Sequence, residues 1–165
     1  MNALIKTFTV ISIAGSIVSC GDDDPKITSK IVGKWKVKSS EIEVNVPGGD
    51  LKNYFITVVG MSEQEATEYT AAVESGDAYE VDVSTIEFKD DGTYLGTSSD
   101  GSTSTGKWSI SSDEKQLTVD QGTTHEETLP IESMTDTTLV IKFDLTHEID
   151  YPQMTYFIHL TFERI

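Results

Sequence analysis

The sequence predicts an all-β domain: an eight-stranded antiparallel up-and-down barrel with a short helical insertion after the first strand. Three observations predict it. Hydrophobic and polar residues alternate from Ile31 onward, and a period of two is typical of half-buried strands. Short Gly, Asp and Ser clusters separate the alternating segments, as hairpin turns require. Eight such segments in sequential order can close into a barrel, which leaves no strand edge exposed.

The first predicted strand covers residues 35–46 and changes phase within its length. Its hydrophobic residues fall first at Trp35 and Val37, then at Ile42, Val44 and Val46. The first two positions are odd and the last three are even, so one strand face cannot hold them all without an irregularity. The change of phase predicts a bulge or bend around residues 39–40.

Residues 51–76 break the alternation and predict the helical insertion. Ser62-Glu63-Gln64-Glu65 has the pattern of a capping box, and Gly76 is placed to end the helix that follows. One face of that helix would carry Ala66, Tyr69, Ala72 and Val73. Residues 51–56 fit either a short preceding helix or another strand, and we expect the helix.

Seven further strands are expected after the insertion, at residues 80–88, 93–97, 106–110, 116–119, 126–131, 138–145 and 154–163. Turn sequences such as Asp90-Asp91-Gly92 separate them, and residues 101–106 read as a polar hairpin loop. The last strand alternates most clearly, because Met154, Tyr156, Ile158, Leu160 and Phe162 share one face. That face should meet the core, and the face with His159 should meet solvent.

The acidic composition excludes some partners. The chain of 165 residues has 28 acidic and 12 basic residues, a net charge of −16. This charge argues against nucleic acid or an anionic lipid surface as a binding partner. The acids are scattered along the chain, so solubility explains them more simply than binding of a cation does.

The first 19 residues have the features of an export signal. Lys6 precedes an apolar run from Phe8 to Val18, about half the ~20 residues that cross a bilayer as a helix. Ile17-Val18-Ser19-Cys20 resembles the lipobox of bacterial lipoproteins, and Cys20 is the only cysteine, so it has no partner for an internal disulfide. The resemblance implies cleavage before Cys20, acyl chains such as palmitate on Cys20, and attachment to a membrane through them.

We therefore expect a lipoprotein signal peptide over residues 1–19, the lipidated cysteine and an acidic tether over 20–30, and one barrel domain over 31–165. Asp22-Asp23-Asp24 in the tether resembles the signal that sends some lipoproteins to the outer face of the outer membrane. The alternative is a plain solvated tether, with the domain on the periplasmic face.

Residues 31–165 resemble lipocalins, and in particular the lipocalin-like domains of small bacterial lipoproteins. The resemblance is carried by Gly33-Lys34-Trp35, by Asp91-Gly92-Thr93-Tyr94, by Gly106-Lys107-Trp108 and by Arg164 near the end of the chain. It implies that Gly33, Trp35 and Arg164 form the barrel floor, with the Arg164 guanidinium on the Trp35 indole. The helical insertion departs from typical lipocalins and occupies the place of the helical lid in fatty-acid-binding proteins.

Residues with catalytic or metal-binding chemistry are few. The histidines, His125, His147 and His159, have no second histidine at metal-ligand spacing. Asp90-Asp91-Gly92 lacks the regularly spaced carboxylates of a calcium loop and is interpreted as a turn. We expect no metal, no cofactor and no enzymatic activity.

Two functions fit this sequence. The first is binding of a small apolar or amphipathic ligand inside the barrel, under a lid made by residues 51–76. The candidate ligand contacts are Phe88, Trp108, Ile141, Phe143, Tyr156, Ile158 and Tyr69. The second is a barrel packed by these large side chains, which serves as a structural or protein-interaction module at the cell surface.

Overall fold

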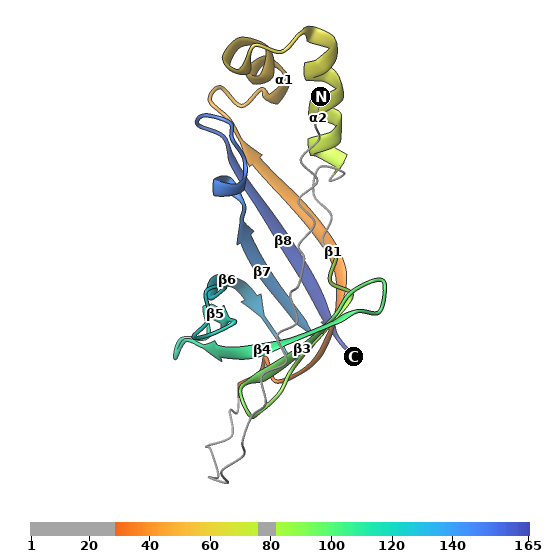
Figure 1. The fold of residues 1–165 in the computed structure, drawn as a ribbon, viewed down its shortest axis with the longest axis vertical. Helices are drawn as coiled ribbons and strands as arrows, with labels where there is room; N and C mark the ends of the chain where they lie inside the picture. The colour runs from red at the N-terminus through yellow and green to blue at the C-terminus, as the bar shows by residue number, and fades with distance from the viewer. Residues whose placement is uncertain (1–28, 76–81) are drawn as a thin grey trace. The chain divides into compact units, whose positions relative to one another are not determined.

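The computed structural model describes residues 29–75 and 82–165, which form a closed antiparallel barrel of eight strands (Figure 1). The strands are β1 (Gly33–Asn45), β2 (Thr85–Phe88), β3 (Thr93–Thr97), β4 (Thr103–Ile110), β5 (Gln116–Val119), β6 (Glu127–Met134), β7 (Thr138–Asp144) and β8 (Thr155–Arg164). Each strand pairs with the next along the chain, and β8 closes on β1. The predicted fold class is therefore confirmed. Residues 1–28 lie outside the described part of the chain. They include the predicted signal peptide, Cys20 and most of the predicted tether.

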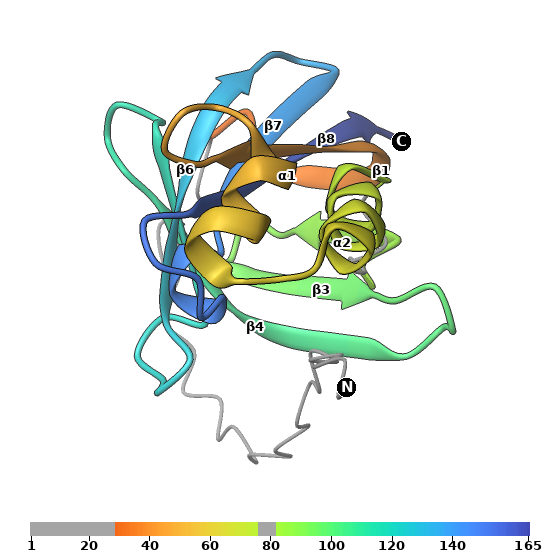
Figure 2. The ribbon, with the colours of Figure 1, turned by 90° about the horizontal axis from the view of Figure 1, so that it is seen from above.

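The insertion between β1 and β2 is helical, as expected. It consists of α1 (Leu51–Tyr54), the π-helix η1 (Phe55–Val59) and α2 (Glu63–Ser75), while a short 3₁₀ helix, η2 (Thr146–Glu148), lies between β7 and β8. Figures 1 and 2 show α1 and α2 side by side. The helical interpretation of residues 51–56 is thus correct and the strand alternative is wrong. None of the helices in the described ranges has the length and apolar character that crossing a membrane requires.

Local sequence signals set the helix ends. The Asp50 carboxylate accepts a hydrogen bond from the Asn53 amide at 2.8 Å and caps α1. At α2 the predicted capping box is present, because the Ser62 amide donates to Glu65 at 2.9 Å and the Glu65 amide donates to the Ser62 hydroxyl at 3.3 Å. Gly60, at a φ of 85°, ends η1 in the left-handed region that favours glycine. Gly76, the expected end of α2, lies outside the described residues.

Several predicted strand boundaries were wrong: β1 begins at Gly33 and not at residue 35, β6 ends at Met134 and not at residue 131, and β2 and β4 differ as follows. β2 begins at Thr85, so residues 82–84 are not part of it, and residues 80 and 81 are not described. β4 begins at Thr103, so most of the predicted loop at 101–106 is strand. The turn is confined to residues 98–102, where the Ser98 amide donates to the Ser102 carbonyl and Gly101 has a φ of 86°. The serines and threonines that follow pair with β3, and threonine favours strands.

The described residues group into two compact units. The helical unit comprises residues 39–75 and 142–160, and the strand unit comprises 29–38, 82–141 and 161–165. The buried core residues of the helical unit are Tyr54, Phe55, Ala66, Val73, Met154, Tyr156, Ile158 and Leu160. Those of the strand unit are Ile31, Trp35, Phe88, Tyr94, Trp108, Leu117, Leu129, Ile131, Leu139, Ile141 and Phe162.

Candidate functional site

In the strand unit, the predicted ligand contacts Phe88, Trp108 and Ile141 are all buried, at 1%, 2% and 3% exposure. Phe88 and Trp108 meet edge to face, with ring centroids 5.3 Å apart. The Trp108 indole N–H donates to the carbonyls of Lys89 and Thr93, at 3.1 and 3.0 Å. Trp108 therefore holds the β2–β3 turn as well as filling the core.

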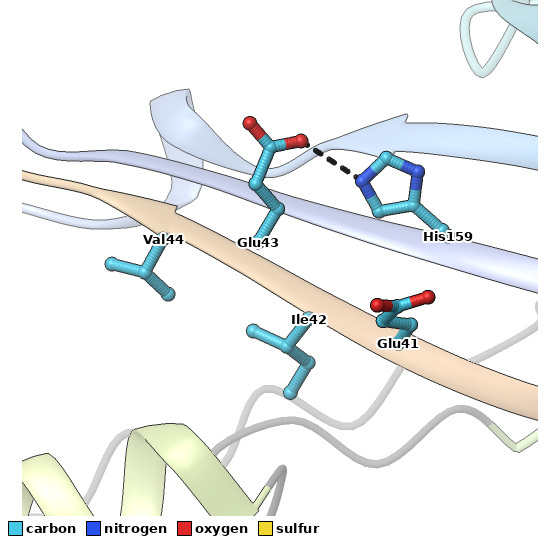
Figure 3. A pocket seen from close by; sticks show the side chains of 5 residues that line it. All are labelled: Glu41, Ile42, Glu43, Val44 and His159. Atoms are coloured by element: carbon cyan, nitrogen blue, oxygen red, sulfur yellow. Dashed lines mark hydrogen bonds and ion pairs between the residues drawn. The ribbon is translucent and has the colours of Figure 1, made fainter.

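In the helical unit, the predicted contacts Tyr156 and Ile158 are buried, while Phe143 is only half-buried. Side chains alternate between the two faces along β7 and β8. Phe143, Tyr156 and Ile158 therefore point inward, while Lys142 and Phe157 point outward. On β1, Ile42 and Val44 are also half-buried and lie on the side of the strand opposite to the Glu43 carboxylate (Figure 3). The inward face of this unit thus carries apolar side chains that keep part of their surface exposed.

Four aromatic rings join the insertion to the connection between β7 and β8. This aromatic cluster consists of Tyr54, Phe55, Tyr69 and Tyr151. Phe55 lies 5.6, 5.4 and 5.5 Å from the rings of Tyr54, Tyr69 and Tyr151 respectively, each contact being edge to face. The Tyr54 hydroxyl donates to the Pro152 carbonyl at 2.6 Å. The insertion is therefore fixed at one side by specific contacts.

Tyr69 is the member of the cluster that the sequence singled out. It is 43% exposed, so it is not a core residue of α2 as its helical position suggested. Its ring instead packs edge to face on the rings of Phe55 and Tyr151. Burial raises the pKa of Tyr151, and its hydrogen bond with Tyr69 raises it further. Burial also raises the pKa of Tyr54. Both phenols are therefore neutral at physiological pH.

A charged cluster lies on the opposite, outward face of the helical unit. The Glu43 carboxylate accepts from Lys142 at 3.1 Å and lies 3.0 Å from the His159 ring nitrogen. The Lys142 ammonium also sits 3.8 Å above the centre of the Phe157 ring. Glu43 and His159 border an open pocket of about 470 Å³ that is also lined by Glu41, Ile42 and Val44 (Figure 3). His159 faces outward, as predicted, but Glu43 partly covers it.

Glu43 is the anionic partner of this cluster. Hydrogen bonds from Asn45, Lys142 and His159, in that order of importance, lower the pKa of Glu43 from 4.5 to about 2. The carboxylate is thus ionised at physiological pH and pairs with the two basic side chains beside it. Within the described ranges, no three His, Cys, Asp or Glu side chains are placed to hold a metal ion. His125 and His147 are exposed.

The lowered pKa of Glu43 gives a pH-dependent prediction. Because its pKa is lower in the folded state, the stabilisation from Glu43 is complete above about pH 4.5 and is lost as the pH falls towards 2. The difference in free energy of unfolding between the native chain and Glu43→Gln should therefore shrink over that range, measured by urea denaturation. Glu41→Gln, an exposed change two residues away, serves as the control. A difference that is independent of pH would contradict the assignment.

In the strand unit, Arg164 binds the segment around Trp35. The guanidinium carbon lies 4.3 Å from the centre of the Trp35 ring, the stacking that the resemblance implies. Arg164 donates to the carbonyls of Val32 and Asp136 at 2.8 and 2.6 Å, and to that of Lys30. A side chain at Gly33, which has a φ of 138°, would collide with this guanidinium. Every nitrogen of Arg164 thus has a carbonyl partner.

Sequence reasoning missed two features of the strand unit. The Tyr94 hydroxyl donates to the Asp120 carboxylate at 2.7 Å, and burial raises the pKa of Tyr94. Gly106 lies under this pair, since a Cβ there would meet the Asp120 carboxylate and come within 2.6 Å of the Tyr94 ring. Both residues belong to the sequence motifs that resemble lipocalins, Asp91-Gly92-Thr93-Tyr94 and Gly106-Lys107-Trp108. The structure pairs Tyr94 with Gly106 across β3 and β4.

The family described as "Lipocalin-like domain" matches residues 31–141. A lipocalin-like protein from Bacteroides uniformis is 13% identical, covers 83% of this chain and 100% of its own, and has a TM-score of 0.38. Bovine odorant-binding protein, solved with its natural ligand, is 15% identical over 88% of this chain and 77% of its own, with a TM-score of 0.37. An uncharacterised protein from Bacteroides eggerthii is 14% identical, over 82% of this chain and 99% of its own, and also has a TM-score of 0.37. No curated protein matches the chain.

Proposed function

Because the chain belongs to the lipocalin-like domain family, we propose that it binds a small apolar or amphipathic molecule in its barrel while lipid on Cys20 holds it at a membrane. The observation that carries the binding proposal is the inward face of the helical unit. Ile42, Val44 and Phe143 are apolar, point inward and are only half-buried. Apolar side chains that keep part of their surface accessible are where a ligand would gain most from burial.

The aromatic cluster supports the same proposal. It joins the insertion to the β7–β8 connection by ring contacts and by the Tyr54 hydrogen bond to Pro152. The four ring contacts and one hydrogen bond anchor the insertion at this side. An insertion held in this way fits a lid that admits a ligand.

The second candidate function is a packed barrel that acts as a structural or interaction module at the cell surface. The strand unit favours it, since Trp35, Phe88 and Trp108 are all at 2% exposure or less. Large side chains fill this unit and leave little of their own surface for a ligand. Binding is therefore assigned to the inward face of the helical unit.

The proposed location rests on the residues that precede the described part of the chain. The lipobox-like sequence ends at Cys20, and Asp22, Asp23 and Asp24 follow it directly. We place the domain at the outer membrane, exposed at the cell surface, with the periplasmic face as the alternative. A net charge of −16 gives the domain no electrostatic attraction to anionic head groups. Attachment would therefore depend on the acyl chains.

Two phenylalanines provide a matched test of ligand binding. Phe143 on β7 and Phe157 on β8 are both half-buried, but Phe143 faces inward and Phe157 lies under Lys142 on the outward face. Binding would be followed by fluorescence of the uncharged probe N-phenyl-1-naphthylamine. Phe143→Ala should weaken probe binding by roughly 1 kcal/mol, about fivefold, since a ligand loses apolar contact area. Phe157→Ala should leave it unchanged.

Two results would overturn the binding proposal. One is the absence of saturable probe binding by the native chain, which would favour the packed module. The other is an equal loss of affinity in the two variants, which would place the probe away from the inward face. Urea denaturation of both variants would establish that each remains folded.

A further inference from the structure

The inward positions of the strands in the helical unit are apolar apart from one tyrosine, and the open pocket beside Ile42 and Val44 is lined by the acids Glu41 and Glu43. Among residues 29–75 and 82–165, no charged or polar side chain is in the buried class. In the helical unit the inward residues are Ile42, Val44, Phe143, Tyr156, Ile158 and Leu160. Tyr156 provides the one hydroxyl among these six residues.

Four charged or ionisable side chains each have a partner within their own unit. Arg164 stacks on Trp35, and all its nitrogens donate to backbone carbonyls. Asp120 accepts from the Tyr94 hydroxyl and is itself an anion. Lys142 and His159 are cationic or can become so, but they lie on the outward face and pair with Glu43. Each of these three basic side chains is therefore already bound to another group of the protein.

The insertion that would admit a ligand is acidic. Residues 50–75 contain five acids, Asp50, Glu63, Glu65, Glu68 and Glu74, and one basic residue, Lys52. Lys52 pairs with Glu63 at 3.3 Å, so its charge is compensated. An approaching carboxylate would meet a negative potential here as well as from the whole chain.

We infer that the barrel selects uncharged amphiphiles, with a hydroxyl or ester as the polar group, and rejects the carboxylates of the same chain length. This inference rests on the proposed ligand-binding function. Burying an ionised carboxylate without a cationic or hydrogen-bonding partner is strongly unfavourable, whereas a hydroxyl or ester costs much less to desolvate. A neutral hydroxyl can hydrogen-bond to an ester or alcohol oxygen, but it cannot neutralise a charge.

A set of ten-carbon compounds tests this selectivity. We would displace N-phenyl-1-naphthylamine from the full mature chain with 1-decanol, methyl decanoate and decanoate at pH 8, where decanoate is ionised. Decanol and the methyl ester should displace the probe at concentrations at least about tenfold lower than decanoate, as expected for a site that offers no partner to a buried charge. Decanoate that competes as well as decanol would overturn the inference, and so would failure of all three to displace a bound probe. Failure of the probe itself to bind would instead overturn the proposed function.

A pair of arginine variants checks that the missing inward cation is the cause. Phe143→Arg places a guanidinium on the inward face and should move the preference towards decanoate. Phe157→Arg adds the same charge on the outward face and should leave the preference unchanged. If both variants shift the preference equally, net charge and not the lining of the barrel sets the selectivity. Urea denaturation shows that each variant is folded before its binding is compared.

Discussion

Replacement of Trp35 by alanine is expected to lower the free energy of unfolding by roughly 3 to 5 kcal/mol. Trp35 is 0% exposed, and its indole N–H donates to the Ile31 carbonyl at 2.7 Å. The substitution removes the ring on which Arg164 stacks and leaves the buried carbonyl of Ile31 without this donor. The whole domain would have a stability of only about 5 to 15 kcal/mol, so a large fraction would be lost. Urea denaturation followed by circular dichroism measures it.

Two further variants separate the causes of this loss. Trp35→Phe keeps an aromatic face under Arg164 but removes the indole donor, so it should cost clearly less than Trp35→Ala. Lys36→Ala changes the exposed neighbour on β1 and should alter stability by no more than about 0.5 kcal/mol. If Trp35→Ala proved as mild as Lys36→Ala, the contact between Trp35 and Arg164 would have no structural role.

Much of the barrel could be predicted because its signals are local. β8 follows the alternation of its sequence from Thr155 to Arg164, with every second residue from Tyr156 to Phe162 buried. The phase change in β1 was also visible, since Trp35 is buried but Glu43, which has the same parity, lies with His159 on the outward face. Each of these features depends on residues a few positions apart.

The contacts that define the candidate sites could not be predicted, because they join residues far apart in the chain. Tyr54 and Pro152 are 98 positions apart, and Glu43 and His159 are 116 apart. A strand pattern states which face a residue occupies but not which side chain lies opposite to it. The β2 boundary failed for a different reason: Asp82-Val83-Ser84 holds a single strand-favouring residue, Val83, and the predicted strand extended too far into it.

The largest functional effect is expected at Cys20, outside the described residues. Cys20→Ser should abolish incorporation of an alkyne-labelled palmitate and move the protein from the membrane fraction to the soluble fraction. Serine has no thiol to accept the diacylglyceryl group, and each acyl CH₂ buried in a bilayer contributes about 0.8 kcal/mol. One ordinary acyl chain thus contributes on the order of 10 kcal/mol, which the acidic domain has no means to replace.

The control for Cys20→Ser is Ser19→Ala, which keeps a small residue before the cleavage site and should leave labelling and membrane attachment intact. The two variants differ in whether the thiol is present, and neither changes a residue of the predicted barrel domain. The domain should therefore have the same stability in both. A Cys20→Ser protein that stays in the membrane fraction would show that another part of the chain holds it there. In that case the acyl chains would not be the anchor. The proposed selectivity of the barrel does not depend on this result.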